Sequence, residues 1–395
     1  MYRKKGQGKN IIQDFSQTAL KTFSAIKTGP NVCDASHQAG PVMAIYIQTY
    51  DYLPPRASGS VSYQSPVYWA ETFFSFLDSQ SAIVNASLSA LTLAHLANSK
   101  CDAALAQHGR HHYGQAMQQI CALRQVEHPT TLVRTGMILA LYEIYNHPLG
   151  CDNPWQVHVQ GAYNLMRELE FPHQALSKHD FRRLCTIEFL RLCISGQSMA
   201  CPNLYFQPKG PSADTFDRLL EILSQTTYLL ATMRRSSYGG LDRNGANSLL
   251  QQSVYSKEEL LTWFHEFQSE EDSRPLFFSQ DMTDDTLERP QETINFTNPS
   301  SIPHLVLYWL GLVAVYASMA KALRVLVRTD ERTCLKERLE TAELLCYRFT
   351  NRLSQSHTGY VGMGQGNTIL LMATSLAAQQ ICQNSQDETI IVANK

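Results

Sequence analysis

Several features that would reveal a function at once are missing from this sequence of 395 residues. Positive charge is not in excess, because the formal net charge at pH 7 is -2. A domain that binds nucleic acid through its phosphates usually carries a basic excess, since counterion release supplies most of that binding free energy. The main basic run is local and consists of Arg3, Lys4, Lys5 and Lys9. We therefore expect DNA contact by this chain to be indirect or weak.

The cysteines lack the spacing of a zinc site. None of the ten forms a C-x-x-C pair, which structural zinc sites usually contain. Most of them lie inside apolar helical patterns, as buried free thiols in a reducing compartment do. No apolar segment follows the basic start of the chain, so we expect no secretory signal. The ten cysteines are Cys33, Cys101, Cys121, Cys151, Cys185, Cys193, Cys201, Cys334, Cys346 and Cys382.

Long hydrophobic runs are also scarce. The most apolar stretch covers residues 305–317, and Lys321 and Arg324 end it short of the ~20 residues that span a bilayer. A membrane helix and a buried core helix both remain open for this stretch. The core helix fits the pattern better, so we expect no membrane partner.

Catalytic signatures are absent as well. The sequence contains neither the G-x-S-x-G turn of serine hydrolases nor the G-x-x-x-x-G-K-S/T loop that cradles phosphates. The glycine-rich run 362–366 is similar to a nucleotide-binding loop, but no strand pattern precedes it and no acidic residue follows about 20 positions later. It predicts a turn before a helix. We assign no catalytic, cofactor-binding or metal-binding residue, and we expect no cofactor.

What the sequence does contain is helical periodicity. Apolar residues make up 44% and charged residues 17%, which is typical of a globular protein with a sizeable core. We predict a weakly ordered segment with a basic start over residues 1–65. Residues 66–395 are predicted to form an all-α, multi-helix bundle of orthogonal or solenoid-like type, as one large domain. The length also allows two closely packed units.

The predicted helices follow from apolar residues at a spacing of 3.6. Pro129 and Pro154 fall where a first helical residue is expected, and no convincing strand pair appears. The predicted helices cover residues 83–97, 113–121, 129–146, 154–169, 181–199, 213–235, 258–267, 302–327, 334–353 and 367–382.

Two interruptions are interpreted as loops. Residues 236–256 are rich in Gly, Ser, Asn and Gln, and residues 269–303 carry eight acidic side chains against two basic ones. A solvated surface loop is the simpler interpretation of the acidic stretch. The alternative is an acidic contact site for a partner, anchored by Phe277 and Phe278.

Three histidines could suggest a metal site. His108, His111 and His112 lie close together, and residues four apart on a helix share one face. No carboxylate or further histidine at a suitable spacing completes a ligand set, and Gly109 interrupts a segment that looks like the start of a helix. Polar surface histidines are therefore the favoured interpretation.

One further histidine lies on an apolar helix face. His158 in such a place is usually a core side chain whose ring nitrogens are hydrogen-bonded, and a ligand or catalytic role is the alternative. An enzyme would need convergent polar residues, and Tyr142 and Glu143 are the other candidates to inspect. Gly161 lowers helix propensity by about 1 kcal/mol relative to Ala, which predicts that another helix packs closely against it.

Three stretches of the chain resemble a known family. The first consists of residues 89–96 with 113–116. The second, Leu139–Ile144, is similar to the family's "LLxLYE" helix, and the third, Trp155–Ala162, is similar to its "W-x-x-H-x-x-G-A" segment. The family is the fungal-specific transcription factor domain, an all-helical regulatory region found downstream of fungal binuclear zinc clusters. Weaker likeness at residues 305–316 and 366–378 extends the resemblance over most of residues 66–382.

The resemblance implies a nuclear regulator or co-regulator of transcription for pathway genes, including secondary-metabolite clusters. Its implied partners are other transcription regulators, coactivators or a second copy of the chain, with a small-molecule effector left open. The six cysteines of the family's zinc cluster are not present, so action through partners or through a missing DNA-binding module is expected. A helical enzyme or accessory protein of a biosynthetic pathway and a structural scaffold are the alternatives.

Overall fold

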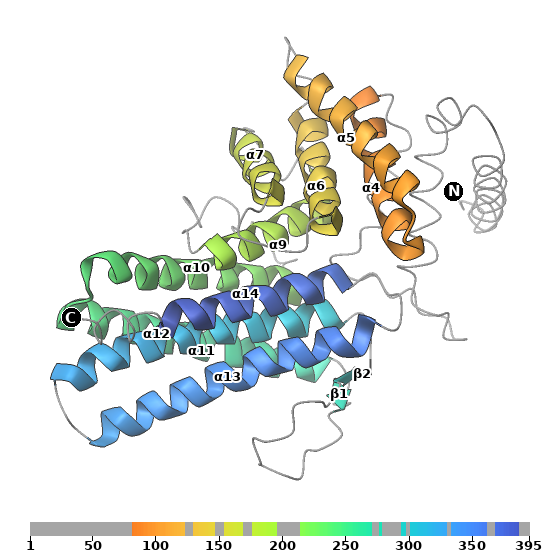
Figure 1. Ribbon diagram of the computed structural model, residues 1–395. Helices are drawn as coiled ribbons and strands as arrows, with labels where there is room; N and C mark the ends of the chain where they lie inside the picture. The colour runs from red at the N-terminus through yellow and green to blue at the C-terminus, as the bar shows by residue number, and fades with distance from the viewer. Residues whose placement is uncertain are drawn as a thin grey trace, which may run out of the picture. The chain divides into compact units, whose positions relative to one another are not determined.

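The computed structural model shows a helical protein (Figure 1). The expected segment 1–65, with its basic start, and the glycine-rich run 362–366 lie outside the residues that can be described. The described residues are 81–122, 129–146, 154–168, 176–195, 214–270, 276–278, 294–297, 301–329, 333–361 and 368–386.

Ten helices and one pair of two-residue strands occur in these described ranges, so the predicted all-α class is confirmed. The elements are α4 (Ala82–Lys100), α5 (Ala103–Ala122), α6 (Pro129–Asn146), α7 (Pro154–Glu168), α9 (Lys178–Ser195), α10 (Thr215–Gly239), α11 (Arg243–Glu270), β1 (Phe277–Phe278), β2 (Asn295–Phe296), α12 (Ile302–Thr329), α13 (Thr333–Val361) and α14 (Thr368–Gln386).

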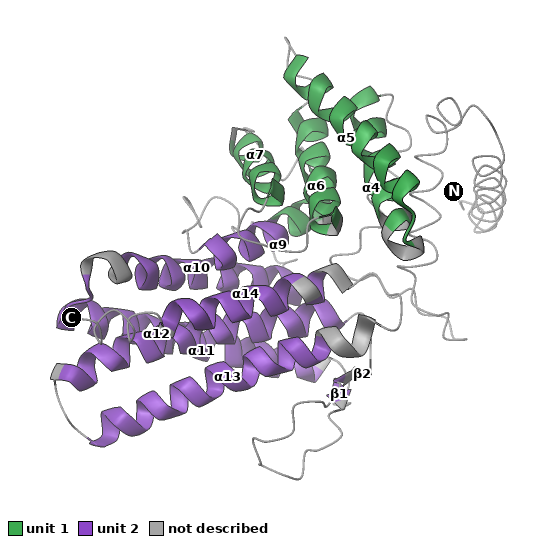
Figure 2. Ribbon diagram, in the orientation of Figure 1, with its two compact units in different colours: residues 1–60, 68–184 green, residues 61–67, 185–395 purple. Residues whose placement is uncertain are grey.

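The chain divides into two compact units (Figure 2). Unit 1 comprises residues 1–60 and 68–184, and unit 2 comprises residues 61–67 and 185–395. The boundary between residues 184 and 185 therefore falls inside α9. Each unit is described separately.

In unit 1, α4 packs against α5 and α6, and α6 packs against α7. A tight turn separates α4 from α5. Cys101 adopts the left-handed conformation with φ 52°, and its N–H donates to the carbonyl of Ala97. The Asp102 carboxylate then accepts from the backbone N–H groups of Ala104 at 2.9 Å and Leu105 at 3.2 Å, which caps α5.

The prolines predicted at first helical positions do begin their helices, since α6 starts at Pro129 and α7 at Pro154. The helix predicted over residues 113–121 lies within α5. Of the apolar residues on which that prediction rested, Tyr113, Met117 and Ile120 pack against a core cluster that contains Ala116, whereas Cys121 is exposed.

The predicted start of α5 is wrong. The helix begins at Ala103, so Gly109 lies inside it rather than before it. A Cβ at Gly109 would lie 3.4 Å from the carbonyl oxygen of Ala90 and 3.4 Å from the backbone nitrogen of Ala94. The glycine therefore lies at a close contact between α5 and α4.

The close packing predicted at Gly161 is wrong as well. Gly161 is exposed, and a Cβ there would meet nothing within 4 Å. The close approach of α6 and α7 occurs at Gly136, where a Cβ would lie 3.0 Å from Ala162 Cβ and 3.2 Å from the carbonyl oxygen of His158. Positions 158 and 162 share one helix face, while position 161 is turned about 100° from position 162.

In unit 2, α12 packs against α10, α11, α13 and α14. It is long and apolar enough to cross a membrane by length and composition, over Ile302–Arg328, and 78% of its most apolar window is buried inside the protein. Even Lys321 is only 1% exposed. This burial matches the core helix that the sequence favoured.

The loop predicted over residues 236–256 is mostly helix. The break is short: α10 ends at Gly239, Gly240 adopts a φ of 75°, and α11 begins at Arg243. The Asp242 carboxylate caps α11 by accepting from the N–H of Gly245 at 2.7 Å. The first half of α11 buries one face, which includes Ala246, and its many polar residues lie on the other face.

A strand pair, absent from the prediction, lies within the range 269–303. β1 and β2 are antiparallel, with Phe277 opposite Phe296. Both rings lie against Trp309 of α12, at centroid distances of 5.2 Å and 6.0 Å. Phe277, proposed from the sequence as an anchor for a partner, therefore contacts its own chain.

Candidate functional site

Three helices of unit 1 bring four polar or aromatic side chains together. Tyr113 comes from α5, Tyr142 and Glu143 from α6, and His158 from α7. Tyr142 and Glu143 are 3% and 4% exposed, while the other two side chains are partly buried. Each helix turns its apolar face inward, and these residues lie on those faces.

Tyr113 is the centre of this group. Its hydroxyl oxygen lies 2.9 Å from Nε2 of His158, and the two rings meet edge to face at a centroid distance of 5.9 Å. On its other side the Tyr113 ring stacks on Tyr142 at 4.6 Å. The Glu143 carboxylate lies close enough to the Tyr113 hydroxyl to act on its pKa.

Burial sets the protonation states. It raises the pKa of the Tyr113 phenol, and the nearby Glu143 carboxylate raises it further. Burial also raises the pKa of Tyr142 to about 12. It lowers the pKa of His158, against the opposing effect of the negative Glu143. At neutral pH Tyr113 therefore keeps its proton and His158 is neutral.

In the 2.9 Å contact between Tyr113 and the neutral His158, either the phenol O–H or the Nε2–H of the imidazole is the donor. Tyr113, Tyr142, Glu143 and His158 meet around the Tyr113 ring, and we call these four residues the Tyr113 network. A connected buried network of this kind fixes the packing of the helices that carry it.

The sequence identified three members of this network and missed the fourth. Tyr142, Glu143 and His158 were the polar residues to inspect, and the structure does bring them together. The hydrogen bond predicted for the His158 ring is confirmed. Tyr113 was not among the candidates, because spacing along a helix does not show that a hydroxyl faces polar groups on other helices.

The histidines of α5 do not converge. Gln115 lies between two of them, with its Nε2 3.0 Å from Nε2 of His111 and its Oε1 3.1 Å from Nδ1 of His112. His111 is exposed, but His112 is only 3% exposed, so the prediction of surface histidines is wrong for His112. No group of three or more His, Cys, Asp or Glu side chains suited to a metal ion occurs in the described ranges.

A second polar feature of unit 1 joins α6 to α9. The buried Asp180 carboxylate accepts from Nε of Arg134 at 3.1 Å, and Nη1 of Arg183 lies 3.4 Å away. Asp180 and Arg183 are 1% and 0% exposed in their side chains. The two arginines supply the charge and the hydrogen bonds that water would otherwise give to this buried carboxylate.

The Tyr113 network and the Asp180 cluster both fall inside a region that matches a known family. The Fungal specific transcription factor domain matches residues 51–273, which is more than half of the chain. The chain belongs to this family. The matched residues of this fungal transcription factor domain contain α4 to α11, and with them all three stretches that carried the resemblance. The weaker likeness at residues 305–316 and 366–378 lies beyond the match.

Comparison of this fungal transcription factor domain with curated proteins and with solved structures finds no match. The family is one of regulatory domains and indicates a role in transcription regulation. Its matched motifs lie in the helix core: Leu139 and Ala162 are 0% and 2% exposed. They define how the helices pack.

Proposed function

We propose that this chain is a nuclear regulator or co-regulator that controls the transcription of a limited set of pathway genes, for example a secondary-metabolite cluster. The observation that carries the proposal is the family match over residues 51–273, which includes the packed core of α4 to α7. Members of a transcription factor family are typically not enzymes.

The chain acts through partners in this proposal. Its net charge of -2 and its lack of any C-x-x-C pair offer little for specific DNA contact. Base readout requires an element that places side chains at base edges in a groove. The partners are other transcription regulators, coactivators, a second copy of the chain, or a separate DNA-binding module. A small-molecule effector is a further ligand class for the helical body.

Two measurements test the proposal together. Transcript profiling of a deletion strain should show changes in a limited set of genes. The purified chain should bind DNA weakly, without sequence preference, and lose that binding between low and physiological salt, since few phosphates are contacted. Substitution of Arg3, Lys4 and Lys5 by Ala should remove the residual binding at low salt. Tight, salt-resistant and site-selective binding would overturn the indirect mode of action.

A second candidate is an enzyme or accessory protein of a biosynthetic pathway. The specific observation in its favour is the convergence of Tyr142, Glu143 and His158 around Tyr113. In that case deletion would remove a pathway intermediate and leave transcripts unchanged. A strain that carries Glu143→Gln would reproduce the loss, provided that the variant accumulates to the wild-type level.

A further inference from the structure

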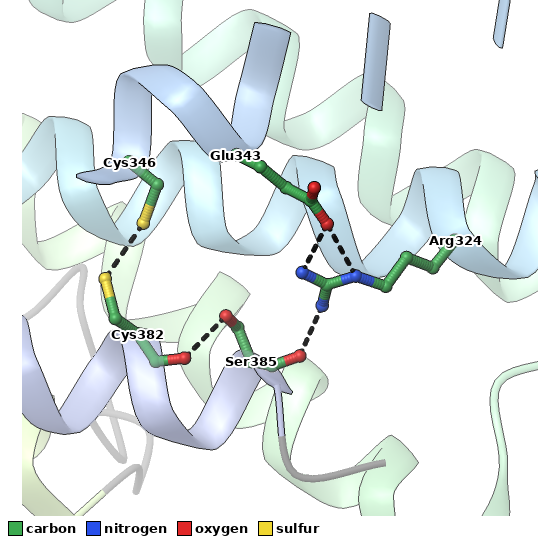
Figure 3. A network of polar contacts seen from close by, with 5 residues as sticks. All are labelled: Arg324, Glu343, Cys346, Cys382 and Ser385. Atoms are coloured by element: carbon green, nitrogen blue, oxygen red, sulfur yellow. Dashed lines mark hydrogen bonds and ion pairs between the residues drawn. The ribbon is translucent and has the colours of Figure 1, made fainter. Parts of the chain in front are cut away.

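Two cysteines from different helices of unit 2 face each other. Cys346 of α13 and Cys382 of α14 point toward one another, and their Sγ atoms are 3.1 Å apart (Figure 3). The two residues are 36 positions apart in the sequence, so only the packing of α13 on α14 brings them together. Neither forms a disulfide in this structure.

The two thiols differ in exposure. Cys346 is 5% exposed, and its Sγ donates to the carbonyl of Val313 at 3.9 Å. Cys382 is partly exposed, and the hydroxyl of Thr350 lies 3.1 Å from its Sγ. A small reagent in solvent therefore meets Cys382 first, while Cys346 lies behind it.

The two thiols also differ in acidity. Contacts with Cys346 and Thr350 lower the pKa of Cys382 to about 7, although burial acts in the opposite direction. The same contact and burial raise the pKa of Cys346 well above its usual range. Near neutral pH Cys382 is therefore the thiol of the pair that ionises more readily. The thiolate is the nucleophilic form of cysteine.

A cation lies close by. Arg324 of α12 forms an ion pair with Glu343 at 2.7 Å and donates to the carbonyl oxygen of Ser385 (Figure 3). Its positive charge lowers the pKa of Cys346, against the charge of Glu343. The arginine links α12, α13 and α14 around the pair, so the sulfur atoms are held between three helices.

We propose that Cys346 and Cys382 form a reversible oxidation site, at which a hydroperoxide converts the two thiols into a disulfide that joins α13 to α14. This inference does not depend on the proposed role in transcription. It rests on the facing sulfur atoms, on their unequal exposure and on the polar groups that surround them.

The reaction balances in two steps. The Cys382 thiolate attacks one peroxide oxygen, the O–O bond breaks, and a sulfenic acid and hydroxide (water after protonation) are formed. The Cys346 sulfur then attacks the Cys382 sulfur, the S–O bond breaks, and the thiol proton leaves with the hydroxyl group as a second water. Two thiols are oxidised and one hydroperoxide is reduced. A dithiol reductant returns both thiols.

The geometric requirement is small. A disulfide has a sulfur–sulfur length of about 2.05 Å, so the two Sγ atoms must approach by roughly 1 Å from their present separation. The other described cysteines offer controls. Cys185 and Cys193 are buried, and burial raises the pKa of both thiols, whereas Cys101, Cys121 and Cys334 are exposed.

The test uses the full chain, purified in reduced form and treated with limiting hydrogen peroxide. After the free thiols are alkylated, peptide mapping without reductant should show one dominant intramolecular link between Cys346 and Cys382. The intact chain should lose the mass of two hydrogen atoms and regain it with dithiothreitol. Unreacted Cys346 and Cys382, or links only among the exposed cysteines, would overturn the proposal.

Variants assign the roles of the two thiols. Cys346→Ser should stop at a sulfenic acid on Cys382 that dimedone captures, and Cys382→Ser should abolish both the link and the capture. Cys334→Ser is the matched control and should leave the link unchanged. Melting curves without peroxide establish whether each variant folds. If a variant does not fold, the peptide mapping of the wild-type chain decides the proposal. Dimedone capture on Cys346 in the Cys382→Ser variant, equal to that on Cys382 in Cys346→Ser, would overturn the assigned order of attack.

Discussion

The two units keep different polar groups in their interiors. Unit 1 buries ionisable groups that pair with one another, in the Tyr113 network and around Asp180. Unit 2 is built around the apolar helix α12, beside which His304 lies among aromatic rings, 4.7 Å from Phe267 and 5.0 Å from Phe216. Unit 2 also buries the thiol pair of α13 and α14 and the ion pair of Glu188 and Arg191 in α9.

This difference shows which conditions each unit responds to. A network of carboxylate, phenol and imidazole depends on protonation, so the stability of unit 1 follows pH. Unit 2 also buries ionisable side chains, among them Glu188, Arg191 and Lys321, but among the described residues it is the unit that holds two facing thiols, so its stability follows the redox state as well. The family match covers every described residue of unit 1 but ends before α12.

The largest effect is expected at Asp180. Asp180→Ala removes the carboxylate and leaves Arg183 buried, which typically destabilises by about 3–5 kcal/mol. The matched control is Glu266→Ala in unit 2, because its pair with Arg218 is exposed and such pairs contribute at most about 1 kcal/mol. Chemical denaturation of both variants measures the difference. Equal losses of stability in the two variants would mean that the buried ion pair matters no more than the exposed one.

A smaller effect is expected from two glycines at the α6–α7 contact. Gly136→Leu should destabilise by about 1–3 kcal/mol, because the side chain would meet Ala162 and the His158 carbonyl. Gly161→Leu on the exposed face should stabilise by up to about 1 kcal/mol, because Leu favours helix over Gly. Denaturant midpoints give the order. If Gly161→Leu lost as much stability as Gly136→Leu, the close packing at Gly161 that was predicted from the sequence would be supported.

Removal of the central hydroxyl tests the Tyr113 network. Tyr113→Phe keeps the stacking on Tyr142 but removes the hydroxyl that hydrogen-bonds His158, and leaving a buried polar group without its partner costs about 1–3 kcal/mol. Tyr255→Phe is the control, since Tyr255 is 59% exposed and should tolerate the change. Thermal melts at pH 7.5 compare the two. An unaffected Tyr113 variant would mean that the network contributes nothing to stability.

The smallest effect concerns pH. Burial lowers the pKa of His158 below its ordinary value of 6.5, so the unfolded chain binds a proton more readily than the folded one. The groups that face it are Tyr113 and Glu143. The resulting stability is fully present above about pH 6.5 and is lost as the pH falls toward the lower folded pKa.

His158→Gln should remove that part of the pH dependence. Unfolding free energies of the variant and of the wild type between pH 5 and pH 8 provide the measurement. Parallel curves for the two proteins would show that His158 does not titrate differently in the folded state.

The sequence predicted helices well where local chemistry decides. Pro129 and Pro154 mark helix starts by themselves, and the apolar run after Ile302 is long enough to specify a core helix. The composition of residues 236–256 led to the wrong prediction of a loop, because glycine and serine lower helix propensity without preventing a helix whose other face is buried. There the packing of α11 on α12 outweighs the local preference.

The candidate sites were harder to predict, because they depend on contacts between helices. A helical period shows that a face is buried, but not what lies opposite to it. Tyr113 meets a partner 45 residues away, and Cys346 one 36 residues away. The prediction of close packing at Gly161 was wrong for the same reason, since the residue next to a contact position lies on a different side of the helix.

The position of α12 in the chain has a consequence for synthesis. A ribosome releases α10 and α11 first and α12 next, so the most apolar helix emerges while α13 and α14 are still untranslated. Until these last two helices arrive, the surface of α12 that they cover stays exposed, and exposed apolar surface favours aggregation. A fragment cut at residue 273, where the family match ends, lacks α12 altogether and leaves α10 and α11 without the helix they pack on.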